Sequence, residues 1–477
     1  MSITAPVRVL HIIGGLGGGG SERLLWDAVR LSDPSRVRHR VVTVYPDNGR
    51  FVYAPRLAAM GAHVPRRSLW HQSWSSHPLG RAANRLWGRL PARQREQCYP
   101  LWQLGVILPT ALARVGEECV RFRPHLVHGH TFHGFAFGLL LRYGLGLPLV
   151  HSMPCLFSQM AAAGHAWMPR VYAWLQAGVT QYFTNYPDEL LAIGVAPERI
   201  LPYRGLVDVE ALERAREARP RHRTEVRRAL GIPPEAPIAL SVGRLDPSKG
   251  HQYALEALPR LLAHCPALHW VVLGEGAQLL ALAKRARALG VDEHVHLPGF
   301  IEDPLPWYAA ADIYLHTAVY EADNLSSFQA MGLGLPVVGF DTGSQTALIP
   351  SVGHGWLVPN RDPAALAQRV AAALALPDRG RGIGALGAAY CAANLDLRLH
   401  VEDLTGAYES LRAARMARTT RRLATAWSTS HASKSLASRG DGCRAGNPSR
   451  ESSTSRHGGA RATRAHALWS TVPPEQE

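Results

Sequence analysis

The chain has 477 residues, more than one hydrophobic core usually supports, so at least two domains are expected. Hydrophobic residues make up 47%, which excludes a wholly disordered or fibrous protein. The net charge is +15, with 52 Lys and Arg against 37 Asp and Glu. Because only three of these basic residues are lysines, we interpret most of the excess as an arginine-for-lysine bias. Nucleic-acid or membrane binding is the alternative that such a charge suggests.

The six cysteines are scattered and form no Cys-x-x-Cys pair, so neither a zinc site nor a disulfide framework is expected. The N-terminus begins almost directly with a strand-like run, without a signal-peptide pattern. No uncharged apolar stretch reaches the length that spans a bilayer. We therefore expect a cytoplasmic protein.

Short apolar runs alternate with helix-like segments along the first half of the chain. The first run is followed by glycines and then by a helical pattern, SERLLWDAVRL. The runs that predict strands are residues 7–13, 40–45, 125–130, 148–152, 181–186 and 199–203. This alternation is typical of a parallel α/β sheet.

The pattern restarts after a charged, Pro-containing stretch, 211–235, which we interpret as a helix plus connector. Strand-like runs then occupy residues 238–242, 270–273, 295–297, 313–315, 337–340 and 355–358, and helix-like segments occupy 250–263, 277–289 and 363–376. We therefore predict an α/β protein of two doubly wound, Rossmann-like domains that face each other across a cleft. Such sheets bind ligands at the carboxyl ends of their strands.

The expected domain boundaries follow from these two units and from a change in composition near Met416. The last 62 residues hold ten serines and ten basic residues against four acidic ones, without periodicity, so they are expected to be disordered. The predicted parts are an N-terminal domain (1–205) with a basic, Trp-rich insertion (65–123), a C-terminal domain (206–395), a helix expected to cross back to the N-terminal domain (396–415), and the disordered basic tail (416–477).

The first chemical signal is the loop GGLGGGGSE (14–22), between a strand and a helix. Glycines allow a ligand to approach the backbone, and a helix N-terminus offers free N–H groups to a phosphate. The G-x-G-x-x-G spacing also invites a dinucleotide-binding interpretation. The acidic residue that this fingerprint requires is missing after the second strand, where Val44 is followed by Tyr45 and Pro46.

Two further signals follow strands of the second unit. In GRLDPSKG (243–250), Arg244 offers a planar fork of donors and Lys249 a point charge, which together suit a diphosphate. In YEADNLSSFQAMGLG (320–334), a helix is expected to begin near residues 324–326, and Glu321 precedes it. The helix start suits phosphate, and the carboxylate suits sugar hydroxyls. A surface turn with incidental charges is the alternative for either segment.

Together these segments resemble the retaining glycosyltransferases of family 4 (group 1), which have the GT-B fold. The resemblance covers about residues 7–412. It rests on Gly19, Gly20 and Glu22, on GRLDPSKG, on LVHGH (126–130), on GVAPERI (194–200) and on YEADNLSSFQAMGLGLPVV (320–338).

The resemblance implies transfer of a hexosyl unit from a nucleotide diphosphate sugar to a glycan or lipid-linked acceptor, in polysaccharide or glycolipid biosynthesis. It implies that the N-terminal domain handles the acceptor and the C-terminal domain the donor. It assigns catalytic roles to Glu321, Arg244, Lys249 and His130. No cofactor and no metal are expected, because the cations and helix dipoles neutralise the leaving diphosphate. The donor-binding residues that it implies are Gly18, Gly19, Gly20, Arg244, Lys249, Gly299, Phe300, Ile301, Glu321, Asn324, Leu325, Ser326 and Gln329.

One departure from the family pattern concerns the second carboxylate, eight residues after Glu321, where this chain has Gln329. In the family that carboxylate holds the ribose hydroxyls. Loss of a charge-assisted hydrogen bond costs roughly 1.5–3 kcal/mol at most, so we expect weaker donor binding. A second departure is Arg204, where members have an asparagine.

The histidines of HGHTFH admit several interpretations. A metal site would need His128, His130 and His133 to converge without a carboxylate partner, and we predict no metal ligands. Two interpretations stay open for His130: a packed structural histidine and, from the resemblance, a contact to the donor sugar or its reacting oxygen. His151 lies similarly at the end of the next strand.

Segment 65–95 combines tryptophans with many arginines, and Arg81, Arg85 and Arg89 form one stripe at helical spacing. Such a helix suits an anionic membrane surface, on the inner face of the cytoplasmic membrane. A solvated arginine face whose leucines pack on the domain is the alternative. Nucleic acid is not needed as a partner to explain the charge.

The alternatives to a transferase are a non-catalytic homologue acting as a binding subunit and a GT-B nucleotide-sugar epimerase.

Overall fold

The computed structural model describes residues 5–17, 19–45, 52–62, 82, 85–91, 94–95, 114–153, 157, 166–203, 205–319, 325–342, 349 and 353–437, with side chains as far as residue 421. Residues 1–417 form one compact unit and residues 418–477 a second. Within the first unit, the described strands form two separate six-stranded sheets.

The first sheet is parallel throughout and has the order β2-β1-β3-β4-β5-β6. Its strands are β1 (Val7–Ile13), β2 (Val37–Thr43), β3 (Leu126–His130), β4 (Leu149–Ser152), β5 (Gln181–Phe183) and β6 (Ile200–Leu201). The helices of this half are α1 (Gly20–Leu31), α2 (Ala54–Ala59), α6 (Thr131–Leu145), α8 (Met168–Leu175) and α9 (Pro187–Ala192), with 3-10 turns at Gln176–Gly178 and Pro197–Arg199.

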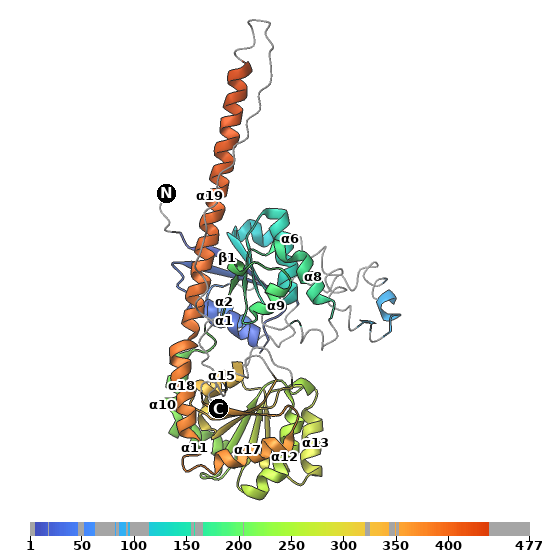
Figure 1. Ribbon diagram of the computed structural model, residues 1–477, viewed down its shortest axis with the longest axis vertical. Coiled ribbons are helices and arrows are strands. Elements are labelled where there is room, and N and C mark those ends of the chain that lie inside the picture. The colour runs from blue at the N-terminus through green and yellow to red at the C-terminus, as the bar shows by residue number, and fades with distance from the viewer. Residues whose placement is uncertain are drawn as a thin grey trace, which may run out of the picture. The chain divides into compact units, whose positions relative to one another are not determined.

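The second sheet is also parallel and has the order β12-β11-β10-β7-β8-β9. Its strands are β7 (Ile238–Val242), β8 (His269–Leu273), β9 (Val295–Gly299), β10 (Ile313–His316), β11 (Val337–Phe340) and β12 (Gly355–Val358). Its helices include α12 (His251–His264), α13 (Leu279–Ala288), α14 (Leu305–Ala310), α15 (Leu325–Gly332), α17 (Pro363–Leu374) and α18 (Arg381–Asn394). Helices α12 and α17 pack against each other beside this sheet (Figure 1).

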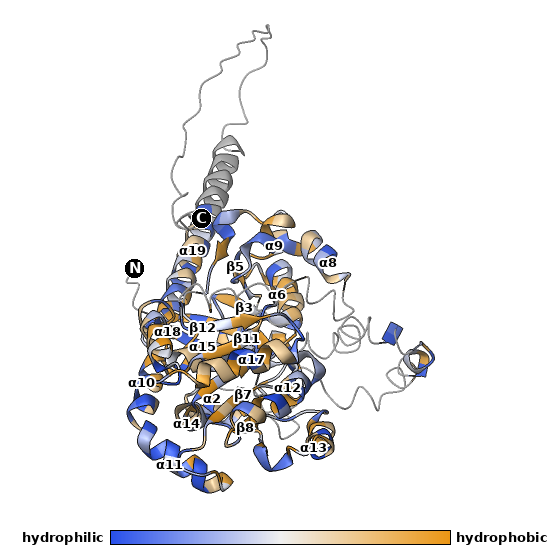
Figure 2. Ribbon diagram, turned by 60° about the horizontal axis from the view of Figure 1, so that its bottom comes forward, coloured by the Kyte–Doolittle hydropathy of each residue, from blue (hydrophilic) through white to orange (hydrophobic). Residues whose placement is uncertain are grey.

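The two doubly wound units that the apolar runs predict are thus confirmed, with small shifts at the strand ends. The second strand is an example, because it lies at Val37–Thr43 rather than at residues 40–45. Its position is set by pairing with the first strand, in which Val7 lies opposite Val37. The strands of both sheets are mostly apolar, as burial on both faces of a parallel sheet requires (Figure 2).

The connection between the two sheets differs from the single helix that we expected. It contains α10 (Val209–Glu217) and α11 (Arg219–Leu230), which are separated at Ala218. Pro220 lies in the first turn of α11, where its missing N–H has no intrahelical partner to lose. In the interior of a longer helix, the same proline would remove a backbone hydrogen bond and clash with the preceding turn. The proline therefore divides the segment into two helices.

A buried ion pair joins α11 to the second sheet. Asp312 immediately precedes β10 and is 3% exposed. Its carboxylate oxygens accept hydrogen bonds from Arg223 Nη1 at 2.7 Å and from Arg227 Nη2 at 3.0 Å. Oδ2 also accepts from the backbone N–H of Ile238, at the start of β7. These bonds compensate for the removal of the charges from water.

Helix α19 (Leu397–Ala437) begins beside the second sheet and returns to the first. Just before α19, the backbone at Asp396 passes close to Gly205. A Cβ at Gly205 would lie only 2.0 Å from the carbonyl oxygen of Asp396, so this close approach requires glycine. Farther along α19, Glu402 and Glu409 accept hydrogen bonds from Arg36, and Arg415 donates to the carbonyl oxygen of His125. These contacts fasten the helix to the first sheet.

Helix α19 continues past Met416, where the change in composition led us to expect a disordered tail. Residues 417–437 hold five alanines and three arginines, which have high helix propensity, but also eight serines and threonines, which do not, so local propensity alone does not explain the continuation. Residues 438–477 lie outside the described part of the chain. Among the helices of the described residues, none combines the length and apolar character that crossing a membrane requires.

Candidate active site

The segment GRLDPSKG forms a tight loop after β7. Asp246 caps a 3-10 turn, Pro247–Lys249, because its side chain accepts the N–H of Ser248 at 2.9 Å. Gly250 follows with φ of 64° and begins α12. A Cβ at Gly250 would lie 1.9 Å from the carbonyl oxygen of Thr317, so the position requires glycine for both its φ and its packing.

Two hydrogen bonds tie this loop to the carboxyl end of β10. The N–H of Val319 donates to the carbonyl oxygen of Ser248 at 2.8 Å, and the Thr317 hydroxyl donates to the carbonyl oxygen of Lys249 at 3.1 Å. The result is a pocket, here called the Lys249 pocket. It is lined by Ser241, Val242, Lys249, His251, Tyr314, Leu315, His316, Thr317, Ala318 and Ser326.

The Lys249 pocket combines a cation with the start of α15, since Ser326 is the second residue of that helix. The first N–H groups of a helix have no intrahelical partner and attract anions. The sequence placed Lys249 and Ser326 in separate motifs, and the structure brings them to one pocket. This arrangement can bind a phosphate group.

The charges around the pocket are those that an anion favours. Arg244 is largely exposed, and its Nη2 lies 3.1 Å from Asp246 Oδ2. Burial raises the pKa of Asp246, but hydrogen bonds from Ser248 and the charges of Arg244 and Lys249 outweigh it and lower that pKa overall. Burial, followed by the charge of Lys249, lowers the pKa of His316 to about 3, so His316 is neutral at pH 7.

The glycine loop lies at the carboxyl end of β1. Gly19 caps α1 with extended backbone, and the Glu22 carboxylate of the first turn lies over this helix start, where a Cβ at Gly19 would be only 2.4 Å from its Oε2. Burial raises the pKa of Glu22, while its backbone hydrogen bond and the charge of Arg244 oppose the rise. Arg244 of the GRLDPSKG loop is therefore close enough to the glycine loop for its charge to act on Glu22.

Other expected donor-binding residues take up positions at the carboxyl end of the second sheet. Gly299 ends β9 with φ of 87°, and its carbonyl oxygen accepts the N–H of Gly274 at 2.8 Å. Phe300 follows and is 41% exposed, and Ile301 is half-buried. Gln329 is half-buried on α15.

Several expected site residues cannot be placed. Gly18, Glu321 and Asn324 lie outside the described residues, as do Arg204 and most of the insertion at 65–123. Of the arginine stripe, residues 85–88 are described as helical. Leu86 is 63% exposed and Leu90 is 40% exposed, so these two leucines are not packed into the described core.

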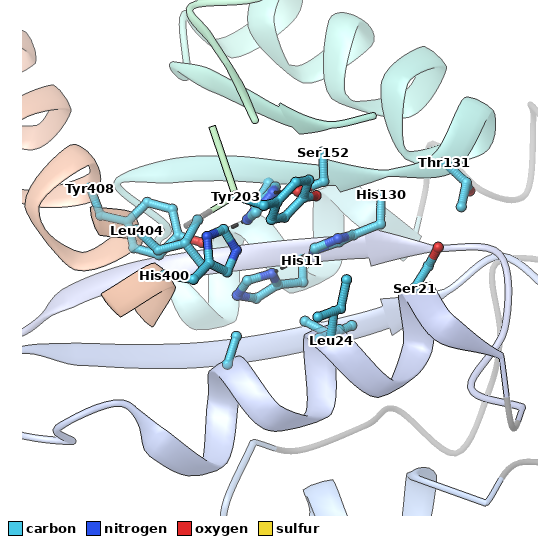
Figure 3. A pocket seen from close by; sticks show the side chains of 13 residues that line it. His11, Ser21, Leu24, His130, Thr131, Ser152, Tyr203, His400, Leu404 and Tyr408 are labelled. Atoms are coloured by element: carbon cyan, nitrogen blue, oxygen red, sulfur yellow. Dashed lines mark hydrogen bonds between the residues drawn. The ribbon is translucent and has the colours of Figure 1, made fainter. Parts of the chain in front are cut away.

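His130 lines a second pocket together with other histidines. We call it the histidine pocket (Figure 3). The pocket lies between the first sheet and helices α1 and α19. Its lining consists of His11, Ser21, Leu24, Leu25, Ala28, His128, His130, Thr131, Ser152, Tyr203, His400, Leu404 and Tyr408. Burial is the main cause that lowers the pKa of His130, to about 3.

The three histidines of HGHTFH do not form one group. His128 and His130 share a face of the sheet, with ring centroids 4.1 Å apart, whereas His133 bonds to the hydroxyl of Tyr45 at 2.7 Å. His151 is buried on the opposite face and bonds to the carbonyl oxygen of Gly129 at 2.9 Å and to the Tyr172 hydroxyl at 3.2 Å. These contacts give His151 a packing role.

Sequence reasoning missed the residues that join His128 and His130 in this pocket. They include His11 on β1 and His400 and Tyr408 on α19. The only available signal was a polar residue inside an otherwise apolar strand run, VRVLHII. Thr131, which also lines the pocket, has φ of 60°, a conformation that β-branched residues adopt only under strain.

Comparison with known proteins gives a consistent picture. Residues 222–384 match the family model described as glycosyl transferases group 1. D-inositol 3-phosphate glycosyltransferase 1 of Catenulispora acidiphila is 30% identical over 311 residues, which are 60% of this chain and 72% of that protein. The chain spans about three fifths of the length of the first curated relatives that it matches, all D-inositol 3-phosphate glycosyltransferases.

Solved structures resemble the fold at low sequence identity. Anabaena Alr3699/HepE, in complex with UDP and glucose, has a TM-score of 0.67 and 17% identity, over 85% of this chain and 100% of that one. WaaG, a glycosyltransferase involved in lipopolysaccharide biosynthesis, has a TM-score of 0.57 and 18% identity, over 84% and 98%. The two parallel sheets and these neighbours establish the GT-B fold. With the family match and the 30% identical relative, the chain belongs to the group 1 glycosyltransferases.

Proposed function

We propose that this protein transfers a hexosyl unit from a nucleotide diphosphate sugar to a glycan or lipid-linked acceptor, with retention at the anomeric carbon. The observation that carries the proposal is the Lys249 pocket, in which a lysine and the start of α15 lie together, with Arg244 on the same loop. Membership of the group 1 glycosyltransferases supports it. The bound UDP and glucose of Anabaena Alr3699/HepE favour a uridine nucleotide as donor.

In the proposed reaction, the bond between the anomeric carbon and the diphosphate oxygen breaks, and its electron pair stays on that oxygen. Lys249, Arg244 and the first N–H groups of α15 stabilise the negative charge that develops there. The acceptor oxygen forms the new bond to the same face of the sugar. Its proton leaves with the diphosphate, whose oxygen gains basicity as the bond breaks. These groups neutralise the charge without a metal ion or a cofactor.

The roles of the remaining residues follow the family resemblance. Glu321 contacts the sugar hydroxyls, and the glycine loop contacts the phosphates. His130 contacts the donor sugar or its reacting oxygen. The burial of His130 keeps its imidazole neutral, so it can donate or accept one hydrogen bond at pH 7 but carries no charge.

For the acceptor, we propose a lipid-linked or glycan substrate of polysaccharide or glycolipid synthesis. WaaG, which shares the fold, is named for lipopolysaccharide biosynthesis. The exposed leucines at 86 and 90 support membrane docking through segment 65–95, at the inner face of the cytoplasmic membrane. Co-sedimentation with anionic liposomes at low salt tests this step, and a protein that stays in the supernatant contradicts it.

Turnover of a panel of nucleotide sugars tests the central activity. We expect release of a nucleoside diphosphate, and NMR of the transferred product to show the anomeric configuration of the donor. Gln329 is the one feature that favours a non-catalytic homologue, which would bind a donor without turnover. An epimerase would instead release a free or rearranged sugar without acceptor-dependent transfer. Either result contradicts the proposal.

A further inference from the structure

Three histidines of the histidine pocket come from two neighbouring parallel strands. In the register of β1 and β3, His11 lies directly opposite His128, and His130 is two residues farther along β3. Residues two apart on a strand face the same side, and paired residues on adjacent strands lie side by side. The register therefore places three imidazoles on one face of a rigid sheet, as Figure 3 shows for His11 and His130.

The ring nitrogens of these histidines converge. His11 Nδ1 lies 3.0 Å from His130 Nε2. One ring nitrogen from each of His11, His128 and His130 lies within 4.8 Å of the other two. In Zn²⁺ sites the Zn–N bonds are about 2.0–2.1 Å, so two tetrahedral ligands are roughly 3.3 Å apart. The His11–His130 pair is already close to this separation, whereas the His128 nitrogen, within 4.8 Å of the others, would have to approach by up to about 1.5 Å.

The same imidazoles are already in the protonation state that metal ions bind. Burial is the main cause that lowers the pKa values of His11 and His128 well below the ordinary value, and that of His130 to about 3. A single proton between His11 Nδ1 and His130 Nε2 makes their hydrogen bond. For both rings to bind a metal ion as neutral imidazoles, this proton must move to the other nitrogen of its own ring, for example to His11 Nε2, which then donates to His39 Nδ1.

Outer partners orient the rings, as they do around many metal-binding histidines. His39 Nδ1 lies 2.9 Å from His11 Nε2, and the Tyr408 hydroxyl lies 2.6 Å from His128 Nδ1. His128 Nε2 lies 2.7 Å from the Ser152 hydroxyl, a contact that a metal ion at this nitrogen would replace. The adjoining pocket has a volume of about 20 Å³, which is enough for one water molecule. That water could supply a fourth ligand, and its ionisation would offset part of the metal charge.

We propose that His11, His128 and His130 form a binding site for a divalent transition metal ion, with Zn²⁺ as the best fit and a pocket water as the fourth ligand. Three imidazoles with one open position suit Zn²⁺, Cu²⁺ or Ni²⁺, and do not suit Mg²⁺ or Ca²⁺, which prefer oxygen ligands. The site is separate from the Lys249 pocket, but it includes His130, to which the proposed function assigns a contact with the donor sugar. The Zn²⁺ measurements use no donor, so they test the site independently of the transfer reaction.

Zn²⁺ binding to the full chain, after treatment with EDTA, tests the proposal. We expect one ion per chain in competition with a chromophoric chelator, a higher Tm with Zn²⁺, and no such change with Mg²⁺. X-ray absorption of the loaded wild-type protein should show three imidazole nitrogens at about 2.0–2.1 Å. This measurement does not depend on the folding of any variant.

Matched variants locate the ion. His11→Gln and His130→Gln should each weaken Zn²⁺ binding by more than about 100-fold, whereas His39→Gln, which removes an outer partner, should weaken it about 10- to 100-fold. His133→Gln is the control, because His133 bonds to Tyr45 outside the cluster. Circular dichroism without metal checks that each variant folds.

Two results would overturn the proposal. One is the absence of stoichiometric Zn²⁺ binding, which would leave the cluster as a hydrogen-bonded core. The other is binding that survives in His11→Gln and is lost in His296→Gln. The rings of His269 and His296 form a second pair, with Nδ1 and Nε2 3.0 Å apart, in the other half of the chain.

Discussion

The Lys249 pocket and the histidine pocket both lie against parallel strands, but they are built in opposite ways. The first depends on a short contiguous loop and carries a positive charge beside a helix start. The second is assembled from residues as distant as His11 and Tyr408, and its histidines are neutral at pH 7 because they are buried. The comparison shows that charge is kept at the exposed strand ends and that neutral imidazoles occupy the interior.

Asp312 is an exception to this contrast, because it is a charged group that is buried in the second half of the chain. Its replacement should have the largest effect. Asp312→Ala removes the partner of Arg227, which is 3% exposed, and leaves that guanidinium buried without its counter-ion. We expect a loss of about 3–5 kcal/mol in the free energy of unfolding, measured by urea denaturation.

The control for Asp312→Ala is on α11, the helix that carries Arg227. Glu225→Ala removes an exposed ion pair with Arg221, and we expect the free energy of unfolding to stay nearly unchanged. Equal losses in the two variants would contradict the distinction between buried and exposed charge in this half.

Gln329 tests whether the second half has lost a charge that its site could use. Gln329→Glu should tighten binding of a nucleotide diphosphate donor about ten- to a hundredfold, because a carboxylate forms the stronger hydrogen bond to a ribose hydroxyl. Isothermal titration calorimetry measures the change. Gln368→Glu, which adds the same charge at an exposed position of α17, should leave donor binding unchanged.

Lowering the pH should destabilise the second half of the chain, because its buried histidines are neutral in the folded state. Burial is the main cause that lowers the pKa of His251 and His354 to about 4 and of His316 to about 3, against 6.5 when unfolded. Below pH 6.5 the unfolded chain therefore binds more protons, and stability falls as pH decreases towards 4. Each such histidine contributes about 1.4 kcal/mol per pH unit. Urea midpoints that stay constant between pH 7 and 5 would contradict this account.

The smallest expected effect concerns the attachment of α19 to the first sheet. Arg36→Ala removes ion pairs with Glu402 and Glu409, both of which are exposed. Because water screens such pairs, we expect a loss of about 1 kcal/mol or less in the free energy of unfolding, and a smaller loss at high salt. Thermal unfolding at two salt concentrations measures it, and a loss comparable with that of Asp312→Ala would contradict the expectation that these exposed ion pairs are weak.

Most of the fold could be predicted because strand runs and glycine loops are local patterns. The runs at Val7–Ile13 and Ile238–Val242 keep their predicted bounds, and GRLDPSKG ends a strand as its sequence indicates. One difference has a local cause, because Pro220 divides one expected helix into α10 and α11. The other is that α19 continues beyond Met416 despite the change in composition there.

The histidine pocket could not be predicted, because it depends on long-range register. His11 meets His128 only because β1 and β3 are neighbours in the sheet, although α1, β2 and α2 lie between them in the sequence. Tyr408 reaches His128 only because α19 returns to the first sheet. A single sequence contains no periodic signal for either contact.

Binding of UDP to wild-type protein and to Lys249→Ala tests most directly the claim that the Lys249 pocket holds the diphosphate of the donor. The lysine supplies a charged donor, so we expect binding about ten- to a hundredfold weaker in Lys249→Ala. Lys284→Ala, at an exposed position of α13, should bind as the wild type does. Equal affinity of UDP for all three proteins would contradict the account.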